Sequence, residues 1–173
     1  MHAYWGEANS PFAVAWLSRS PGRVTNHRLP VLEKTLLELE LEGLRLFATH
    51  LSAGRKLADE PRRIREMQAV LEVARDGDLL VGDFNAVNPE DEVGQPTEAL
   101  EHVSRRPIEL ALDAGFVDAF RSLHPEHGWT YTTAHPWARL DYVLAKGLAV
   151  RKCSVVTSAC DASDHFPVAA DLA

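Results

Sequence analysis

The chain has 173 residues, 46% of them apolar, and its 25 acidic and 18 basic side chains give a formal net charge of -7 at pH 7. This length and apolar content predict a single globular domain, residues 1–173, with a core of its own, and they exclude an intrinsically disordered chain. The acidic balance excludes a generally basic surface, so nucleic-acid contact would need a local cluster such as Arg62, Arg63 and Arg65, or Arg105 and Arg106. The simpler interpretation of these arginines is that they are solvated helix charges.

The first part of the chain predicts strands. Phe12–Ser18 is an apolar run that ends in a turn sequence, and Leu36–Leu41 alternates apolar with acidic residues. Gly43 separates Leu36–Leu41 from Leu44–His50, which is the pattern of a β-hairpin whose second strand ends at a histidine. A polar linker, Ser52–Glu60, follows this hairpin.

A helix is predicted after the linker. From Pro61 onward, apolar residues recur at helical spacing: Ile64, Met67, Leu71 and Ala74. Asp76 and Gly77 mark the end of this helix. This helix leads directly into a short apolar run, Leu79–Val81, that is typical of a buried strand.

The second half of the chain alternates a loop, a helix and several strands. A loop rich in proline, glycine and acids spans Asn88–Thr97, and a second helix is predicted around Ile108–Ala114. Five short segments after it favour strands: Phe116–Arg121, Trp129–Thr133, Leu140–Ala145, Val150–Val156 and Pro167–Leu172. Strands on both sides of amphipathic helices predict an α/β sandwich with mixed sheets.

Cysteine chemistry and a membrane span are not predicted. Cys153 and Cys160 are the only cysteines, too few for a disulfide framework, so we expect both to be reduced. No apolar stretch is long enough to cross a membrane, and the first residues lack the pattern of a signal peptide. The chain as given is therefore expected to be cytoplasmic.

The strand Leu79–Val81 ends in Gly82-Asp83-Phe84-Asn85, which places an acid and an amide two residues apart. Because side chains alternate along an extended chain, Asp83 and Asn85 would point the same way while Phe84 turns back to the core. This arrangement suits a metal or phosphate site. A plain turn is the alternative, since Asp and Asn commonly form turns through their own hydrogen bonds.

Polar residues mark the ends of three other apolar runs. His50 closes one strand, and Asp141 lies within an otherwise apolar strand, where an ionised carboxylate is costly unless it is paired. Asp164 and His165 are adjacent just before the final strand. Each of these has a structural alternative, a hydrogen-bonded histidine or an ordinary turn.

Taken together and in this order, Gly82–Asn85, Arg139–Tyr142 and Ser163–Val168 resemble the endonuclease/exonuclease/phosphatase superfamily, the deoxyribonuclease-I-like fold. Phe47–Leu51 and Phe12–Arg19 fit the same resemblance, which covers nearly the whole chain. It implies a four-layer α/β sandwich with two mixed β-sheets flanked by helices, here in a truncated form.

The resemblance implies roles for residues at the phosphate and at the attacking water. The residue matching Asp83 orients or deprotonates the water, and the one matching Asn85 holds the phosphate and that water. His50 matches a second phosphate-binding group.

The resemblance also implies a divalent cation, Mg²⁺ or Mn²⁺. Asp164 would be its ligand or would contact a ligand, with Asp83 beside it, and hard cations of this kind take oxygen ligands. Such an ion neutralises phosphate charge and activates water. His165 would contact the scissile phosphate, and Asp141 would accept the other ring hydrogen of His165 and fix its tautomer and charge.

The chain departs from the family at its start. Family members begin with a strand carrying an asparagine and a second strand ending in Gln-Glu, whose glutamate is the main metal ligand, and neither is found here. The chain is therefore interpreted as N-terminally incomplete. Glu7 could replace that glutamate, but a solvated loop acid is the alternative, since no strand is predicted before it. The missing part could also have held a signal or an anchor.

Three outcomes are open for such a chain: a catalyst with a rearranged metal site, an inactive remnant, or a homo-oligomer joined through unpaired sheet edges. The leading function is metal-dependent phosphoester hydrolysis of the phosphodiesterase or nuclease type, on DNA, RNA or another phosphoester. The alternative is a catalytically weak or inactive domain that binds a phosphate-bearing ligand or partner. A metal-independent acid phosphatase is not supported, since no arginine-histidine nucleophile motif or reactive cysteine loop is present.

Overall fold

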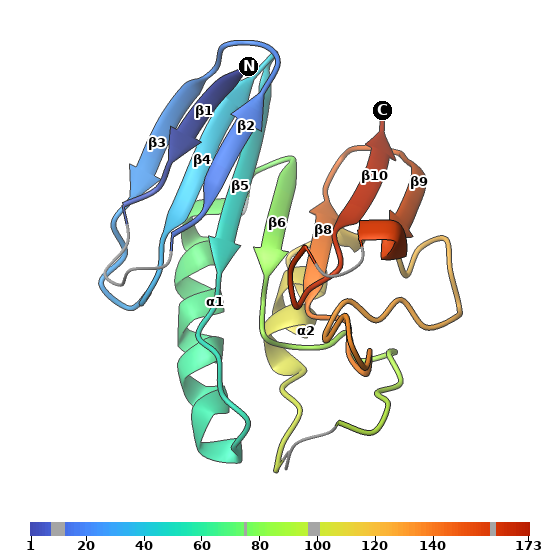
Figure 1. Cartoon of the computed structure of the whole chain (residues 1–173). Coiled ribbons are helices and arrows are strands. Elements are labelled where there is room, and N and C mark those ends of the chain that lie inside the picture. The colour runs from blue at the N-terminus through green and yellow to red at the C-terminus, as the bar shows by residue number, and fades with distance from the viewer. Residues whose placement is uncertain (8–12, 75, 97–100, 160–161) are drawn as a thin grey trace.

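A six-stranded mixed sheet forms the centre of the computed structural model, which describes residues 1–7, 13–74, 76–96, 101–159 and 162–173 (Figure 1). Its strands are β3 (Arg23–His27), β4 (Leu36–Leu41), β5 (Leu44–His50), β6 (Leu79–Asp83), β7 (Val117–Asp118) and β8 (Asp141–Ala145). Their order across the sheet is β3-β4-β5-β6-β8-β7, and β5 with β6 is the parallel pair within it. A parallel pair needs a crossover, and α1 (Glu60–Ala74) supplies it.

Two antiparallel ribbons lie on one face of this sheet, and the helices lie on the other (Figure 1). The first ribbon pairs β1 (His2–Trp5) with β2 (Ala15–Ser18), and the second pairs β9 (Val150–Val155) with β10 (Val168–Leu172). The helical layer consists of α1 and α2 (Arg106–Asp113), which pack against each other. Short 3-10 turns at Leu57–Asp59 and Thr157–Ala159 complete the described elements.

The main core lies between the central sheet and the helices. Met67 and Val70 of α1 are fully buried there against Leu80 of β6 and Leu144 of β8. Val143, the neighbour of Leu144 in β8, packs instead with the β9–β10 ribbon on the opposite face. The central sheet is therefore apolar on both faces, as expected for a sheet covered on both sides.

Several predicted elements are found. The hairpin has the predicted bounds, with its turn at Glu42 and Gly43, both at positive φ. The predicted first helix is α1, and the strand predicted at Leu79–Val81 is β6. The α/β class and the mixed central sheet are confirmed. Within the described residues, the second sheet layer consists of the two antiparallel ribbons.

Other elements differ from the prediction. Strands β1 and β3 were not predicted, because β1 is short and β3 is largely polar, so neither has a strong apolar pattern of its own. Glu7 consequently does follow a strand. The segment Trp129–Thr133 is not a strand and makes only isolated bridges at Tyr131. Strand β2 begins at Ala15, and Phe12, where that strand was predicted to start, lies outside the described residues.

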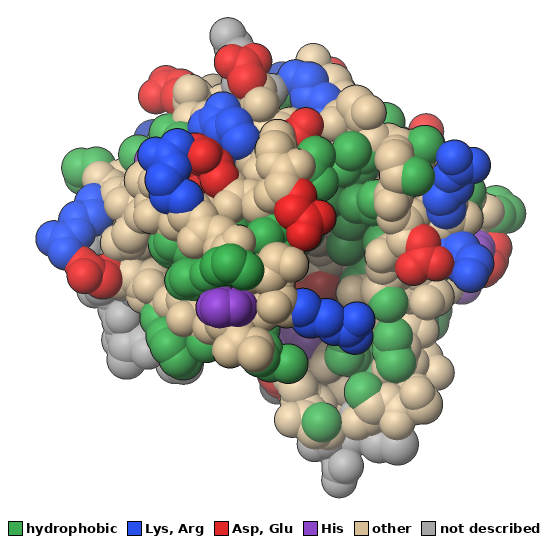
Figure 2. Space-filling model, turned by 90° about the horizontal axis from the view of Figure 1, so that it is seen from above, with side chains coloured by type: hydrophobic (Ala, Val, Ile, Leu, Met, Phe, Trp, Pro, Cys, Tyr) green, Lys and Arg blue, Asp and Glu red, His purple; other side chains and the backbone are tan. Residues whose placement is uncertain are grey.

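The outer face of the β1–β2 ribbon carries exposed apolar side chains. Trp5 is 71% exposed and Leu17 is 65% exposed, and the strand register places both on the same face. Among the described residues each ribbon has only two strands. The space-filling view from above also shows hydrophobic side chains around a hollow in the molecule (Figure 2). Self-association through sheet edges stays a prediction.

The cysteine and membrane expectations can be compared with the described residues. Cys153 is buried and unbridged, and burial raises the pKa of its thiol to about 11, so the thiol is unreactive at neutral pH. Cys160 lies outside the described residues. No helix in the described ranges combines the length and the apolar character needed to cross a bilayer.

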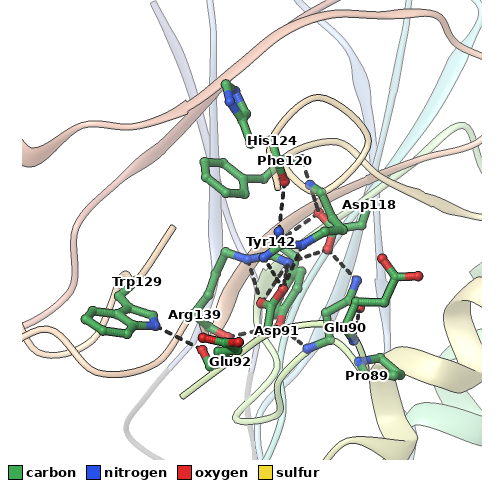
Figure 3. Close-up of polar contacts among 12 residues, drawn as sticks. Pro89, Glu90, Asp91, Glu92, Asp118, Phe120, His124, Trp129, Arg139 and Tyr142 are labelled. Carbon is green, nitrogen blue, oxygen red and sulfur yellow. Dashed lines mark hydrogen bonds and ion pairs between the residues drawn. The ribbon is translucent and has the colours of Figure 1, made fainter. Parts of the chain in front are cut away.

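A buried charge network fastens the loop after β6 to β7 and β8 (Figure 3). The Arg139 guanidinium, almost fully buried, donates four hydrogen bonds of 2.6 to 3.0 Å to Asp91 and Asp118. The Tyr142 hydroxyl donates to the Arg139 carbonyl at 2.9 Å and accepts from the Asn88 amide at 2.7 Å. Asp91 and Asn88 belong to the loop that follows the acid and amide of β6, so this network fixes the base of that loop.

Loss of the arginine is predicted to destabilise the fold strongly. Arg139→Ala leaves two buried carboxylates without their main partner, and breaking a buried ion pair in this way costs about 3–5 kcal/mol. Denaturant unfolding should show this loss in the free energy of unfolding. Arg151→Ala, which removes an exposed arginine of β9, is the control and should change stability by about 0.5 kcal/mol or less. Equal stabilities of the two variants would contradict the role of the network.

Candidate active site

Three polar side chains meet at one edge of the central sheet because of strand register. His50 is paired with Asp83 across the parallel strands β5 and β6, and Asp83 is paired with Asp141 across the antiparallel strands β6 and β8. Two strands end and one begins at this edge, where Figure 1 shows the arrowheads of β5 and β6. The residues are 33 and 58 positions apart in sequence, and the sheet alone brings them together.

A pocket of about 550 Å³ opens at this edge, a size typical of small-molecule and cofactor sites. Six of the predicted site residues line it: His50, Asp83, Asn85, Asp141, Asp164 and His165. Side chains that were not predicted complete the wall, chiefly Lys34, Arg55, His102, Tyr131 and Trp137. The pocket therefore gathers basic, acidic and aromatic groups from segments spread over most of the chain.

The acid and the amide after β6 come together through a turn. Asn85 adopts a left-handed conformation with φ of 47°, which asparagine tolerates well. Its backbone amide donates to Asp83 at 2.8 Å, and its side-chain amide donates to Asp83 at 3.2 Å and to the Leu51 carbonyl at 3.0 Å. Phe84 between them is fully buried, as predicted. The turn itself therefore brings Asp83 and Asn85 together. From the sequence, the expected cause was the alternation of side chains along a strand.

Gly82 is required by the neighbouring strand. Its φ is +143°, and a Cβ placed on it would lie 1.8 Å from the carbonyl oxygen of Thr49 in β5. A glycine is therefore needed here because the backbone of β5 approaches so closely. The glycine lets β5 and β6 pair up to the pocket.

His165 is held by Asp141 and by an aromatic neighbour. Its Nδ1 lies 2.7 Å from a carboxylate oxygen of Asp141, and its ring centroid lies 4.7 Å from that of Tyr131. The backbone also fixes this loop, since the Thr133 amide donates to the Asp164 carbonyl at 2.9 Å. With the Nδ1 hydrogen donated to Asp141, Nε2 is the ring atom left for a ligand.

The electrostatic surroundings favour a charged His165. Burial alone would lower the pKa of this imidazole, but the hydrogen bond to Asp141 and the charges of Asp141, Asp83 and Asp164 together raise it above its ordinary value. Asp141, an acid within an apolar strand, therefore has His165 as the partner that it requires.

His50 has two close neighbours. Its Nε2 lies 3.2 Å from a carboxylate oxygen of Asp83 and in contact with the ammonium of Lys34. Burial lowers the pKa of Lys34, while the charges of Asp83, Glu33 and Glu66 act in the opposite direction. Lys34 has no sequence signal beyond its place two residues before a strand.

The described residues do not assemble a metal site by themselves. No group of three or more histidine, cysteine or acidic side chains lies close enough to hold an ion, within the ranges the structure describes. Glu7 does not line the pocket; its carboxylate is 67% exposed and pairs with Arg28, which favours the solvated-acid alternative. Asp83 and Asp164 place carboxylate oxygens on the pocket wall, a donor type that suits Mg²⁺ when substrate phosphate supplies further oxygens.

Buried charges of α1 hold the loop that follows His50. Glu66 accepts hydrogen bonds from the amide and the hydroxyl of Ser52 at 2.8 and 2.5 Å, and Arg63 donates to the Gly54 carbonyl at 3.2 Å. Arg63 is almost fully buried, so it is neither a solvated helix charge nor a nucleic-acid contact. The loop it holds brings Arg55 to the pocket, where its guanidinium donates to the Tyr131 hydroxyl at 3.4 Å.

A pH titration tests the pairing of His165 with Asp141. Asp141→Asn removes the hydrogen-bonded charge that raises the pKa of His165, so burial should then dominate and the pKa should fall. NMR titration of the His165 ring, with chelator present, measures the change directly. An unchanged pKa in the variant would contradict the pairing.

The same shift predicts how stability depends on pH. Because the folded-state pKa of His165 is raised, the stability that the pair contributes is fully present below the ordinary histidine pKa of about 6.5 and is lost as pH rises through the raised value. The difference in unfolding free energy between the natural chain and Asp141→Asn should therefore shrink as the pH rises through the raised pKa of His165.

The chain is similar in sequence to proteins of one family. The model of the Endonuclease/Exonuclease/phosphatase family matches residues 5–165. The DNA repair nuclease APEX1 of Danio rerio is 31% identical over an alignment of 111 residues that covers 55% of this chain and 36% of that relative. The chain thus matches little more than a third of that relative's length.

Solved structures share the fold. A 3′ phosphatase from Neisseria, NExo, bound to a product DNA hairpin, superposes with a TM-score of 0.78 at 24% identity, over 99% of this chain and 79% of that one. An endonuclease/exonuclease/phosphatase from Beutenbergia cavernae superposes with a TM-score of 0.74 at 24% identity, over 99% of this chain and 53% of that one.

Proposed function

The chain belongs to the endonuclease/exonuclease/phosphatase family, and we propose that it hydrolyses a phosphoester, as a phosphodiesterase or nuclease, by attack of water on phosphorus. The observation that carries this proposal is the meeting of two hydrogen-bonded pairs in one pocket. Asp83, at the end of β6, is hydrogen-bonded to Asn85, and Asp141, at the start of β8, is hydrogen-bonded to His165. One pair suits activation of water and the other suits protonation of a leaving oxygen.

The proposed reaction consumes one water molecule. Asp83 takes a proton from the water as its oxygen bonds to phosphorus, and Asn85 donates a hydrogen bond to the phosphate. The bond from phosphorus to the leaving oxygen breaks, and His165 gives that oxygen its proton. Asp141 stabilises the imidazolium before transfer and keeps the ring oriented. Exchange with solvent then returns a proton to His165 and removes one from Asp83.

We also propose that Mg²⁺ or Mn²⁺ supports this reaction. Asp83 and Asp164 would hold the ion together with substrate oxygens, since Mg²⁺ is commonly bound by one or two carboxylates and by phosphate. When bound, it supplies neutralisation of phosphate charge and activation of water.

DNA is the substrate class that the comparisons favour. One relative is a DNA repair nuclease, and one solved structure contains a product DNA hairpin. Tyr131 and Trp137 offer an edge-to-face aromatic pair on the pocket wall, which suits contact with an unpaired base or a sugar. Arg55 beside them offers a phosphate contact. RNA or another phosphoester remains within the proposal.

A domain that binds a phosphate-bearing ligand without turnover is the second candidate. The absence of a three-ligand metal group among the described residues favours it. Its site would be the same pocket.

Hydrolysis of a generic phosphodiester and of plasmid DNA by the purified chain tests the proposal. We expect turnover with Mg²⁺ or Mn²⁺ that is lost with chelator. His165→Ala and Asp83→Ala should each lower kcat by about 10²–10⁴-fold, the usual contribution of a positioned acid or base.

His2→Ala and Asp171→Ala, which remove exposed groups of β1 and β10, are the matched controls and should keep full activity. Full activity in both active-site variants would place the reaction elsewhere. A folded chain without turnover that still binds phosphate would favour the binding domain.

A further inference from the structure

Lys34 occupies the end of the row of polar side chains at the sheet edge. Leu36 in β4 is paired with Thr49 in β5, so the residues just before β4 lie beside the end of β5. This register brings the Lys34 ammonium into contact with Nε2 of His50 and into the lining of the pocket. From one end to the other, the row runs Lys34, His50, Asp83, Asp141 and His165.

The backbone that carries Lys34 is firmly held. Thr35 is buried, and its hydroxyl donates to the Asn26 side chain at 2.6 Å. The Thr49 hydroxyl donates to the Thr35 carbonyl at 3.1 Å, which ties this residue to β5. A long side chain on a fixed backbone next to the pocket is placed as functional side chains must be, on a rigid element.

The side chain of Lys34 is only partly exposed and faces carboxylates. Burial lowers the pKa of Lys34 below its ordinary value, and the nearby charges of Asp83, Glu33 and Glu66 partly offset this effect in favour of the ammonium. A cation on the wall of a pocket is well suited to attract and hold an anion.

Donor counting separates the roles of Lys34 and His50. An ammonium has three donors and no acceptor, so the contact between Nζ and Nε2 makes the imidazole nitrogen the acceptor. A ring nitrogen that accepts from lysine has no hydrogen to give to a phosphate. On this side of the pocket, the ammonium is therefore the group that can donate to a phosphate oxygen.

We propose that Lys34 is a catalytic residue that binds the phosphate of the substrate and balances the charge that develops on it, at the end of the row opposite His165. The phosphate then lies between a cation at each end, with the water-activating pair Asp83 and Asn85 in the middle. The role has particular weight here, because three carboxylates line the pocket among the described residues and Asp141 is hydrogen-bonded to His165, which leaves Asp83 and Asp164 for a metal ion. This inference rests on the proposed function.

Substitution of Lys34 tests the inference by two independent readouts. Lys34→Met keeps most of the side-chain length and removes the charge, and Lys34→Arg keeps the charge. Binding of inorganic phosphate, measured by calorimetry, and kcat and KM for a phosphodiester are compared with the natural chain. Lys152→Ala removes an exposed lysine of β9 and is the control.

We expect Lys34→Met to lower both phosphate affinity and kcat/KM by about tenfold to a hundredfold. This range corresponds to the 1.5–3 kcal/mol of a hydrogen bond to a charged group, at 1.4 kcal/mol per tenfold. Lys34→Arg should recover most of the loss, and Lys152→Ala should show none. Circular dichroism and thermal melting should show that Lys34→Met folds; if they do not, recovery in Lys34→Arg still measures the need for the charge.

The outcomes separate this inference from the proposed function. If the natural chain turns over substrate and Lys34→Met matches it in kcat/KM and phosphate affinity, the role of Lys34 is overturned and the function stands. If the chain binds phosphate without turnover, the loss of binding in Lys34→Met still supports the role. If the chain neither binds phosphate nor turns over substrate, both are overturned.

Discussion

The register of β5, β6 and β8 is the constraint on which the site depends. One parallel and one antiparallel pairing align His50, Asp83 and Asp141 at a single sheet edge. A slip of one residue in either pairing would turn one of these side chains to the other face and into the core. The register is itself protected, because Gly82 lets the Thr49 carbonyl approach and the two faces of β6 and β8 pack against different apolar layers.

Two buried charge systems hold the loops that complete the pocket. Arg139 pairs with Asp91 and Asp118 and so fixes the loop after Asn85. Glu66 and Arg63 of α1 fix the loop after His50. Both systems replace hydrophobic packing with hydrogen bonds of defined geometry, which specifies loop position more narrowly than apolar contact does. The groups at the pocket can then be partly exposed while the charged side chains that hold the loops are buried.

Local patterns explain which parts could be predicted. The hairpin, α1 and β6 have strong periodicity or clear turns of their own, and the acid, amide and histidine at strand ends stand out against apolar runs. Strands β1 and β3 are defined by their partners and have no such pattern. Lys34 and Arg139 could not be assigned roles, since nothing near either in sequence shows what it contacts: the one depends on a register between distant strands, and the other on carboxylates 21 and 48 residues away.

The central claim is that this sheet edge forms one phosphate site, and a crystal structure of the chain with inorganic phosphate tests it most directly. The phosphate should lie in the pocket with oxygens within hydrogen-bond distance, about 2.7–3.2 Å, of nitrogen atoms of Asn85, His165 and Lys34. Phosphate bound at another place on the molecule, or in the pocket without contact to Asn85 and His165, would contradict the claim.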